Sequence, residues 1–170
     1  TKVSARIFRS VDEGATWAPS ETNFSEAECS NRGGPMWPAL VQIVQSTINP
    51  LHYWAATFMV GSSDTDAPST IENGVFRSTD GGVSWAAANS GLPDFNGIPG
   101  TTAADVLSLA FDGSDPTGQT LYASTNADFL LGTVYKTTDG GLNWSFAGTG
   151  LTDRDVRDLV VDPTNGHVFA

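Results

Sequence analysis

The stretch FRSTDGGVSW, Phe76–Trp85, decides how this chain folds, because two other stretches share its pattern. They are FRSVDEGATW at Phe8–Trp17 and YKTTDGGLNW at Tyr135–Trp144. Each has an aromatic residue, a basic residue, Ser or Thr, an Asp two positions later, a Gly two positions after that and a closing Trp. Three such matches in 170 residues predict a fold built from repeated units.

Each residue type in the pattern has a mechanical role in a tight turn. The Asp accepts hydrogen bonds from backbone amides ahead of it, and the Ser or Thr adds a hydroxyl bond. The Gly takes a positive φ without steric cost. The Trp starts the next strand and packs beneath its own turn or between units. The residues with these roles are Ser10, Asp12, Gly14, Trp17, Ser78, Asp80, Gly82, Trp85, Thr137, Asp139, Gly141 and Trp144.

Two further strands are expected before each turn. Val106–Asp112 is an apolar strand, and Asp115–Ser124 is a Pro-containing turn followed by a short aromatic strand. The same order occurs at Leu40–Ser46 with Asn49–Thr57, and at Val156–Asp162 with the chain end. Four short antiparallel strands per unit, joined by short turns, are typical of a β-propeller blade.

We therefore predict an all-β fold: a β-propeller of four-stranded antiparallel blades with Asp turns, about three blades per chain. The chain, residues 1–170, forms a single propeller unit. Its expected divisions are a partial blade at 1–20, a blade at 21–93, a blade at 94–151 and the first strands of a next blade at 152–170.

The composition narrows the class of protein. The chain has 19 acidic and 8 basic residues, a net charge of −11, which repels nucleic acids and anionic membranes. No apolar run is long enough to span a bilayer. The acidic surface suits a secreted protein, so we expect an extracellular or periplasmic location, with the signal peptide outside this sequence.

The repeated pattern resembles the Asp-box, or BNR repeat, of sialidases, xyloglucanase-type glycoside hydrolases, sortilin-like receptor domains and photosystem II assembly factors. VFRSTDGGVSW and VYKTTDGGLNW are most similar to secreted bacterial propellers of the xyloglucanase or assembly-factor type. The resemblance implies a β-propeller. It does not imply an activity, because in these families the Asp-box lies far from the active centre.

A catalytic assignment finds little support in the residues. Glycoside hydrolysis needs two carboxylates that flank the sugar, and no spacing singles out a pair. The loop candidates are Asp64, Asp66, Asp94, Asp105 and Asp128. His52 and His167 occupy equivalent repeat positions, which repetition explains better than a metal, so we expect neither a metal nor a cofactor.

The stretch Ala18–Val41 is the least repetitive part of the chain. Its extra apolar residues Phe24, Met36 and Trp37 can stack on a sugar ring or dock a protein, or can be buried over the propeller face. Cys29 has no partner at metal-binding spacing.

The two ends of the chain look like halves of one strand. Joining HVFA to TKVSARIFRS reproduces the order of LYASTNADFLLGTVYKTT. The residues of this expected assembly junction are Thr1, Lys2, Val3, His167, Val168, Phe169 and Ala170. Three blades cannot close a propeller. Two copies closing a ring, copies linked into a filament, and a stretch of a longer protein all remain open.

Two functions follow from this pattern. The first is a non-catalytic secreted module that associates with copies of itself by completing a blade, with a glycan or protein on a loop face. The second is a carbohydrate-active glycoside hydrolase of the xyloglucanase-like type, or a fragment of one.

Overall fold

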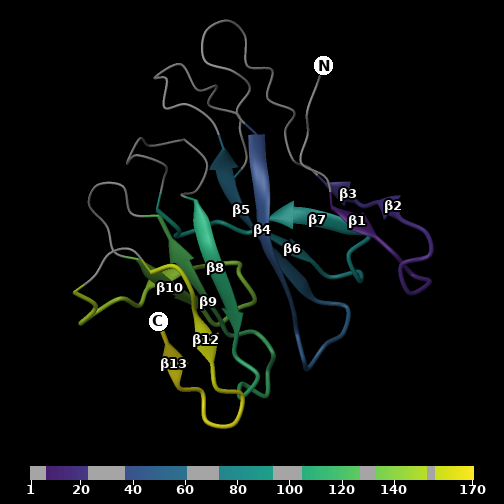
Figure 1. The fold of residues 1–170 in the computed structure, drawn as a ribbon. Coiled ribbons are helices and arrows are strands. Elements are labelled where there is room, and N and C mark those ends of the chain that lie inside the picture. The colour runs from purple at the N-terminus through teal and green to yellow at the C-terminus, as the bar shows by residue number, and fades with distance from the viewer. Residues whose placement is uncertain (1–6, 23–36, 61–72, 94–104, 127–132, 153–155) are drawn as a thin grey trace, which may run out of the picture.

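The computed structural model describes residues 7–22, 37–60, 73–93, 105–126, 133–152 and 156–170. These residues form strands and turns, and none of them lies in a helix. The predicted all-β class is therefore confirmed (Figure 1). Among the described residues no helix is long and apolar enough to cross a membrane.

Two larger sheets form the centre of the fold, and each contains four consecutive antiparallel strands. The first contains β4 (Trp37–Gln45), β5 (Tyr53–Val60), β6 (Gly74–Ser78) and β7 (Ser84–Ala87). The second contains β8 (Val106–Phe111), β9 (Leu121–Thr125), β10 (Val134–Thr137) and β11 (Ser145–Phe146). The predicted four-stranded antiparallel unit is present in both.

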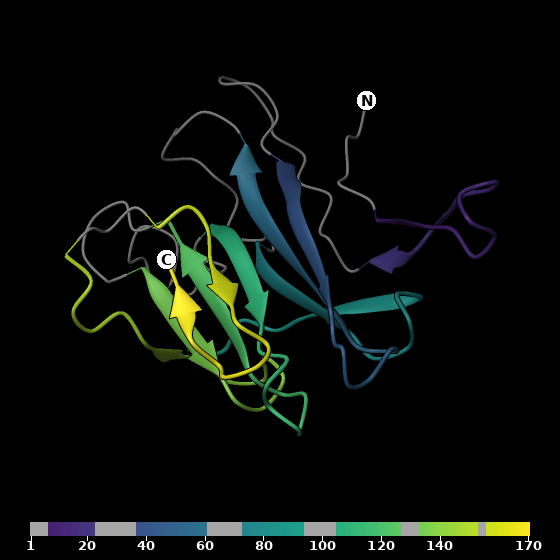
Figure 2. The same cartoon turned by 60° about the horizontal axis from the view of Figure 1, so that its bottom comes forward.

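A two-stranded pair flanks this centre on each side. The N-terminal pair is β1 (Phe8–Arg9) with β2 (Ala18–Pro19), and the C-terminal pair is β12 (Val160–Val161) with β13 (Val168–Phe169). Figures 1 and 2 show the two pairs at opposite ends of the row of sheets.

One strand departs from the four-strand expectation. β3 (Glu21–Thr22) pairs in parallel with β7, with Glu21 opposite Ser84 and Thr22 opposite Trp85, so the first large sheet has five strands. The outer edge of β7 leaves backbone groups that need partners. The segment that follows β2 supplies them.

The two large sheets also share details of register. Each carries an irregularity in its first strand, between Leu40 and Gln42 in β4 and between Val106 and Ser108 in β8. The turn after that strand closes with the same amide-to-carbonyl bond in both large sheets and in the β12–β13 pair. The bonds are Ser46 to His52 at 3.0 Å, Asp112 to Thr120 at 3.0 Å and Asp162 to His167 at 2.8 Å.

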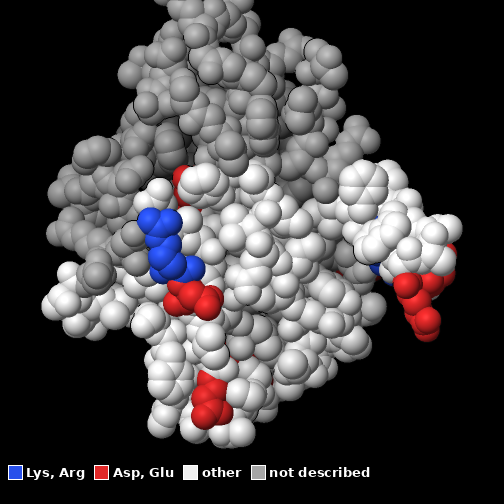
Figure 3. Space-filling model, in the orientation of Figure 1, with Lys and Arg blue, Asp and Glu red and all other residues white. Residues whose placement is uncertain are grey.

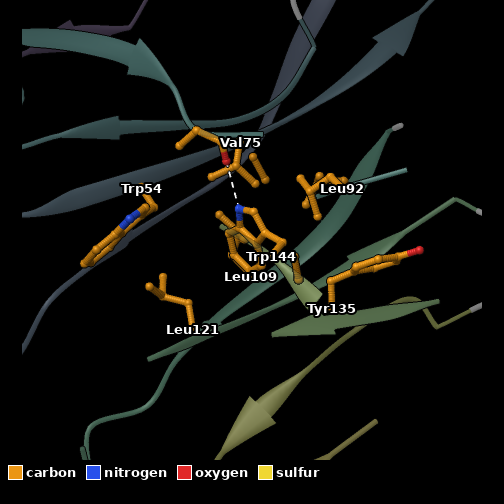
Figure 4. Packing of buried hydrophobic residues seen from close by; sticks show 11 residues of the cluster. Trp54, Val75, Leu92, Leu109, Leu121, Tyr135 and Trp144 are labelled. Carbon is orange, nitrogen blue, oxygen red and sulfur yellow. Dashed lines mark hydrogen bonds between the residues drawn. The ribbon is translucent and has the colours of Figure 1, made fainter. Parts of the chain in front are cut away.

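The sheets stack face to face, and their apolar faces make three clusters. The largest fills the space between β4–β7 and β8–β11 and includes Trp54, Leu109, Leu121 and Trp144 (Figure 4). A second, around Phe76 and Trp85, lies beneath the β1–β2 pair. The third joins the β8–β11 sheet to β12.

Candidate functional site

The three Asp turns share one hydrogen-bond network. In each, the Ser or Thr hydroxyl donates to the Asp carboxylate two residues later, at 2.7–2.8 Å. The same hydroxyl accepts from the Gly amide four residues later, at 2.8–3.0 Å. The three sets are Ser10, Asp12 and Gly14; Ser78, Asp80 and Gly82; and Thr137, Asp139 and Gly141.

The glycines of these turns adopt a left-handed backbone conformation. Their φ values are 89° at Gly14, 81° at Gly82 and 93° at Gly141. A residue with a Cβ is disfavoured at such angles, which is why the pattern has Gly there. The residue before them is also left-handed: it is Gly81 and Gly140 in two turns, but Glu13, with φ 58°, in the first.

The aspartates of these turns are held in their ionised form. A side-chain hydrogen bond from Thr16, followed by that residue's amide and the Ser10 hydroxyl, lowers the pKa of Asp12 to about 2. The Asn143 side chain and amide lower the pKa of Asp139 to about 2, and bonds from Ser84 lower the pKa of Asp80. A carboxylate held in this way stabilises its turn and is poorly suited to act as a general acid.

The tryptophans that close the turns lie in three different environments. Trp144 is buried and donates its indole N–H to the Ala88 carbonyl of the neighbouring sheet at 2.8 Å. Figure 4 marks this hydrogen bond with a dashed line. Trp85 is also buried, but its indole nitrogen has no hydrogen-bond partner among the described residues. Trp17 is 63% exposed and donates to Gly14 in its own turn.

Sequence reasoning did not single out Trp54, which joins the two large sheets. Its indole N–H donates to the Gly140 carbonyl of the Asp139 turn at 2.8 Å, and its ring stacks on Phe111 at 5.8 Å. Trp54 is fully buried. No local sequence signal indicates this role, because the carbonyl that Trp54 reaches lies 86 residues later in the chain.

In the second and third patterns, the basic residue faces an aromatic residue on the adjacent strand. Arg77 pairs with Trp54, and Lys136 pairs with Tyr122, whose ring centroid lies 5.3 Å from the Lys136 ammonium. A cation at this distance from a ring is attracted to its face. Arg9, on β1, has the same place in the first pattern.

A cavity of about 430 Å³ opens between the β1–β2 pair and the β4–β5 hairpin. Its lining is mainly apolar and includes Ile7, Phe8, Ile43, Leu51, Tyr53 and Trp85. Ile43 is 42% exposed and Leu51 is 53% exposed. The β4–β7 sheet is therefore only partly covered on the side that faces β1.

The residues of the expected assembly junction are only partly described. Thr1, Lys2 and Val3 lie outside the described residues. His167 closes the turn before β13, and Val168 and Phe169 pair with Val161 and Val160 of β12, with Ala170 following them. Phe169 is 61% exposed and Val160 is 56% exposed. Apolar side chains are thus exposed at this end of the row of sheets as well.

Most of the loop candidates lie outside the described residues: Phe24, Cys29, Met36, Asp64, Asp66, Asp94 and Asp128. Trp37 is the first residue of β4. Asp105 is buried, and its carboxylate accepts a 2.5 Å hydrogen bond from the side-chain nitrogen of Asn73. The side-chain oxygen of Asn73 accepts a hydrogen bond from the Thr57 hydroxyl at 2.7 Å. No group of three metal-ligating side chains occurs within the described ranges.

The surface carries its charges unevenly. The face shown in Figure 3 has few charged side chains over the described strands. Acidic groups are visible near the tip of the β1–β2 hairpin. On this face, charge is therefore sparse over the described strands.

No family model and no curated protein matches this chain. Solved structures do match it. An ancestral GH74 enzyme aligns with a TM-score of 0.57 and 17% identity, over 94% of this chain and 18% of its own. The GH74 enzyme of Niastella koreensis aligns with a TM-score of 0.50 and 19% identity, over 92% of this chain and 20% of its own. This chain thus spans about a fifth of these enzymes and shares the β-propeller fold of that part of them.

Proposed function

We propose that this chain is a blade-forming segment of an Asp-box β-propeller that is carbohydrate-active, as the GH74 enzymes are. It would contribute about three blades, divided at 1–20, 21–93, 94–151 and 152–170. The observation that supports this most is the stacking of two equivalent sheets through Trp144 and Trp54, in a fold that aligns with a GH74 enzyme over 94% of the chain.

The segment has a structural and glycan-binding role in this proposal. Glycoside hydrolases need a general acid whose pKa is raised, beside a second carboxylate. Asp12, Asp80 and Asp139 have lowered pKa values and are occupied by turn bonds. The reacting carboxylates would therefore come from other loops or another segment, and the proposal requires no cofactor.

Native gel electrophoresis with soluble xyloglucan in the gel tests this proposal. We expect xyloglucan to slow the protein and the α-linked polymer dextran to leave its mobility unchanged. A parallel assay should find no new reducing ends from xyloglucan. Equal mobility in both gels would contradict the glycan role, and hydrolysis by this chain would contradict the non-catalytic role.

A second candidate function is self-association by blade completion, as a secreted module outside the cytoplasm. Two observations support it: the apolar cavity beside β1, and the exposed Val160 and Phe169 at the other end. Light scattering during size exclusion should then give a mass above the 17.9 kDa of one chain. A mass of one chain at all concentrations would contradict it.

A further inference from the structure

We propose that the β12–β13 hairpin of one copy docks into the cavity beside β1 of a second copy. There it would extend the β1–β2 pair into a four-stranded sheet. This inference rests on the proposed self-association and specifies its contacts and register. The closed interface between the two large sheets serves as its template.

The template fixes which residues meet. In the first large sheet Tyr53 is opposite Ser78 and Trp54 is opposite Arg77. In the second, Leu121 is opposite Thr137 and Tyr122 is opposite Lys136. Val168 follows its turn as Tyr53 and Leu121 follow theirs. Phe169 is likewise equivalent to Trp54 and Tyr122.

The predicted register in the docked sheet follows from this equivalence. Val168 of one copy lies opposite Ser10 of the other, and Phe169 lies opposite Arg9. Phe169 then faces a basic side chain, as Tyr122 faces Lys136. Phe169 and Arg9 are both exposed in the single copy and would gain this contact on docking.

The backbone edges are suited to this pairing. β1 pairs with β2 and β13 pairs with β12, and the described residues provide no strand on the second side of either. Such edges readily accept a further strand. The two edges lie at opposite ends of the sheets (Figures 1 and 2), so the pairing joins separate copies.

The cavity is where the docked hairpin would lie. In the closed interface, Leu109 is 1% exposed because the β4–β5 hairpin covers it. Its repeat equivalent on β4 is Ile43, which is 42% exposed and lines the cavity. A hairpin placed over Ile43 and Tyr53 would make the two interfaces alike.

A turn contact would complete the docked sheet. The amide of Gly81 donates to the Leu51 carbonyl, and the amide of Gly140 donates to the Gln119 carbonyl, both at 2.9 Å. Glu13 is the equivalent of these glycines and has the same left-handed conformation. In the docked pair its amide would donate to the Gly166 carbonyl of the other copy.

Contacts of this kind join one end of a copy to the opposite end of the next. Such head-to-tail contacts give a ring if the rotation closes and a filament if it does not. Each chain carries a net charge of −11, so copies repel one another at long range. Association through apolar contacts should therefore strengthen as salt screens the charge.

Mass measurement with three variants tests the docking surfaces. Phe169→Asp changes the hairpin and Ile43→Asp changes the cavity. Leu142→Asp changes a residue of the Asp139 turn that is 58% exposed and belongs neither to the β12–β13 hairpin nor to the cavity lining. We expect the first two to shift the wild-type oligomer to single chains and the third to leave it intact. An oligomer that all three variants preserve would overturn the docking site but not self-association, whereas a wild-type monomer would overturn both.

Disulfide crosslinking tests the register. In a Cys29→Ser background, which removes the one native cysteine, a chain with Arg9→Cys is mixed with a chain carrying Phe169→Cys. Residues directly opposite on antiparallel strands are close enough for a disulfide. We expect an oxidised dimer on a non-reducing gel. Val168→Cys in place of Phe169→Cys is the control, because its side chain points to the other face. Equal crosslinking in both mixtures would overturn the register.

Discussion

The same repeated unit makes two interfaces that differ in how completely they close. Between β4–β7 and β8–β11, Leu109, Leu121 and Trp144 are all nearly or fully buried. On the β4–β7 face that looks toward β1, Phe76 and Trp85 are buried but Ile43 is 42% exposed. The β1–β2 pair covers one half of this face and leaves the other half open. Burial is thus set by the neighbouring sheet rather than by residue type.

The indole hydrogen bonds show the same contrast. Trp144 reaches the Ala88 carbonyl across the closed interface, whereas the nitrogen of Trp85 is buried and finds no partner in the part of the chain that the structure describes. The residue equivalent to Ala88 is Ser20, whose hydroxyl donates to the Gly82 carbonyl at 2.6 Å. A buried donor without a partner costs about 1–3 kcal/mol. The described part of the open interface therefore leaves a buried hydrogen-bond donor unpaired, in addition to leaving apolar side chains exposed.

Removing a closing tryptophan should give the largest difference between the two regions. We expect Trp144→Ala to lower the free energy of unfolding by about 3–5 kcal/mol, because it empties the main cluster. Trp17→Ala should cost less than about 1 kcal/mol, because Trp17 is 63% exposed. Urea unfolding followed by circular dichroism measures both. Similar losses would mean that the two turns are equally covered.

Gly91→Ala should show how tightly the closed interface is packed. A Cβ at Gly91 would lie 2.2 Å from the Trp144 carbonyl oxygen, and φ there is +86°. We expect a loss of about 2–4 kcal/mol from backbone strain plus the clash. Gly150→Ala is the matched control, since φ is +90° but an added Cβ would meet none of the described residues beyond its chain neighbours within 4 Å. Its loss should stay near the 1–2 kcal/mol of strain alone. Equal melting temperatures for the two variants would contradict a close contact at Gly91.

Replacing the indole nitrogens compares the hydrogen bonds directly. Trp144→Phe leaves the Ala88 carbonyl without its donor, while Trp85→Phe removes a donor that has no partner. After subtraction of the shared loss of ring volume, we expect Trp144→Phe to be about 1–2 kcal/mol more costly. Chemical denaturation of the two variants measures this difference. A larger loss for Trp85→Phe would indicate that its N–H does bind a group.

The smallest effect should be the dependence of stability on pH. The pKa values of Asp12 and Asp139 are about 2 in the folded protein, below the ordinary 3.8. Their stabilising contribution is therefore fully present above about pH 4 and is lost as the pH falls toward 2. We expect the melting temperature to fall across this range and Asp139→Asn to flatten the fall. An unchanged slope in that variant, measured by thermal scans at each pH, would contradict the role of the carboxylate.

The local parts of the fold could be predicted from the sequence. The Asp turns involve residues at most four apart, so their bonds are encoded within ten consecutive residues. The four-stranded antiparallel units followed from the alternation of apolar stretches and Pro turns before each Asp turn. Both kinds of signal are short in range.

Long-range parts could not be predicted in the same way. Trp54 donates to a carbonyl 86 residues later in the chain, so no local pattern indicates its role. β3 is only two residues long and has no periodicity to detect, although it adds a fifth strand beside β7. The differing exposure of Trp17, Trp85 and Trp144 is likewise absent from a motif in which all three look alike.

The sequence by itself determined the repeated unit: the turn with its Asp, Gly and hydroxyl, and the strands on either side of it. It could do so because these contacts form between near neighbours in the chain and require no other sheet. Only the tertiary structure decided which unit is covered and which remains open, because burial and long hydrogen bonds depend on what packs against each face. This is why equivalent residues, Leu109 and Ile43, are buried at one interface and exposed at the other.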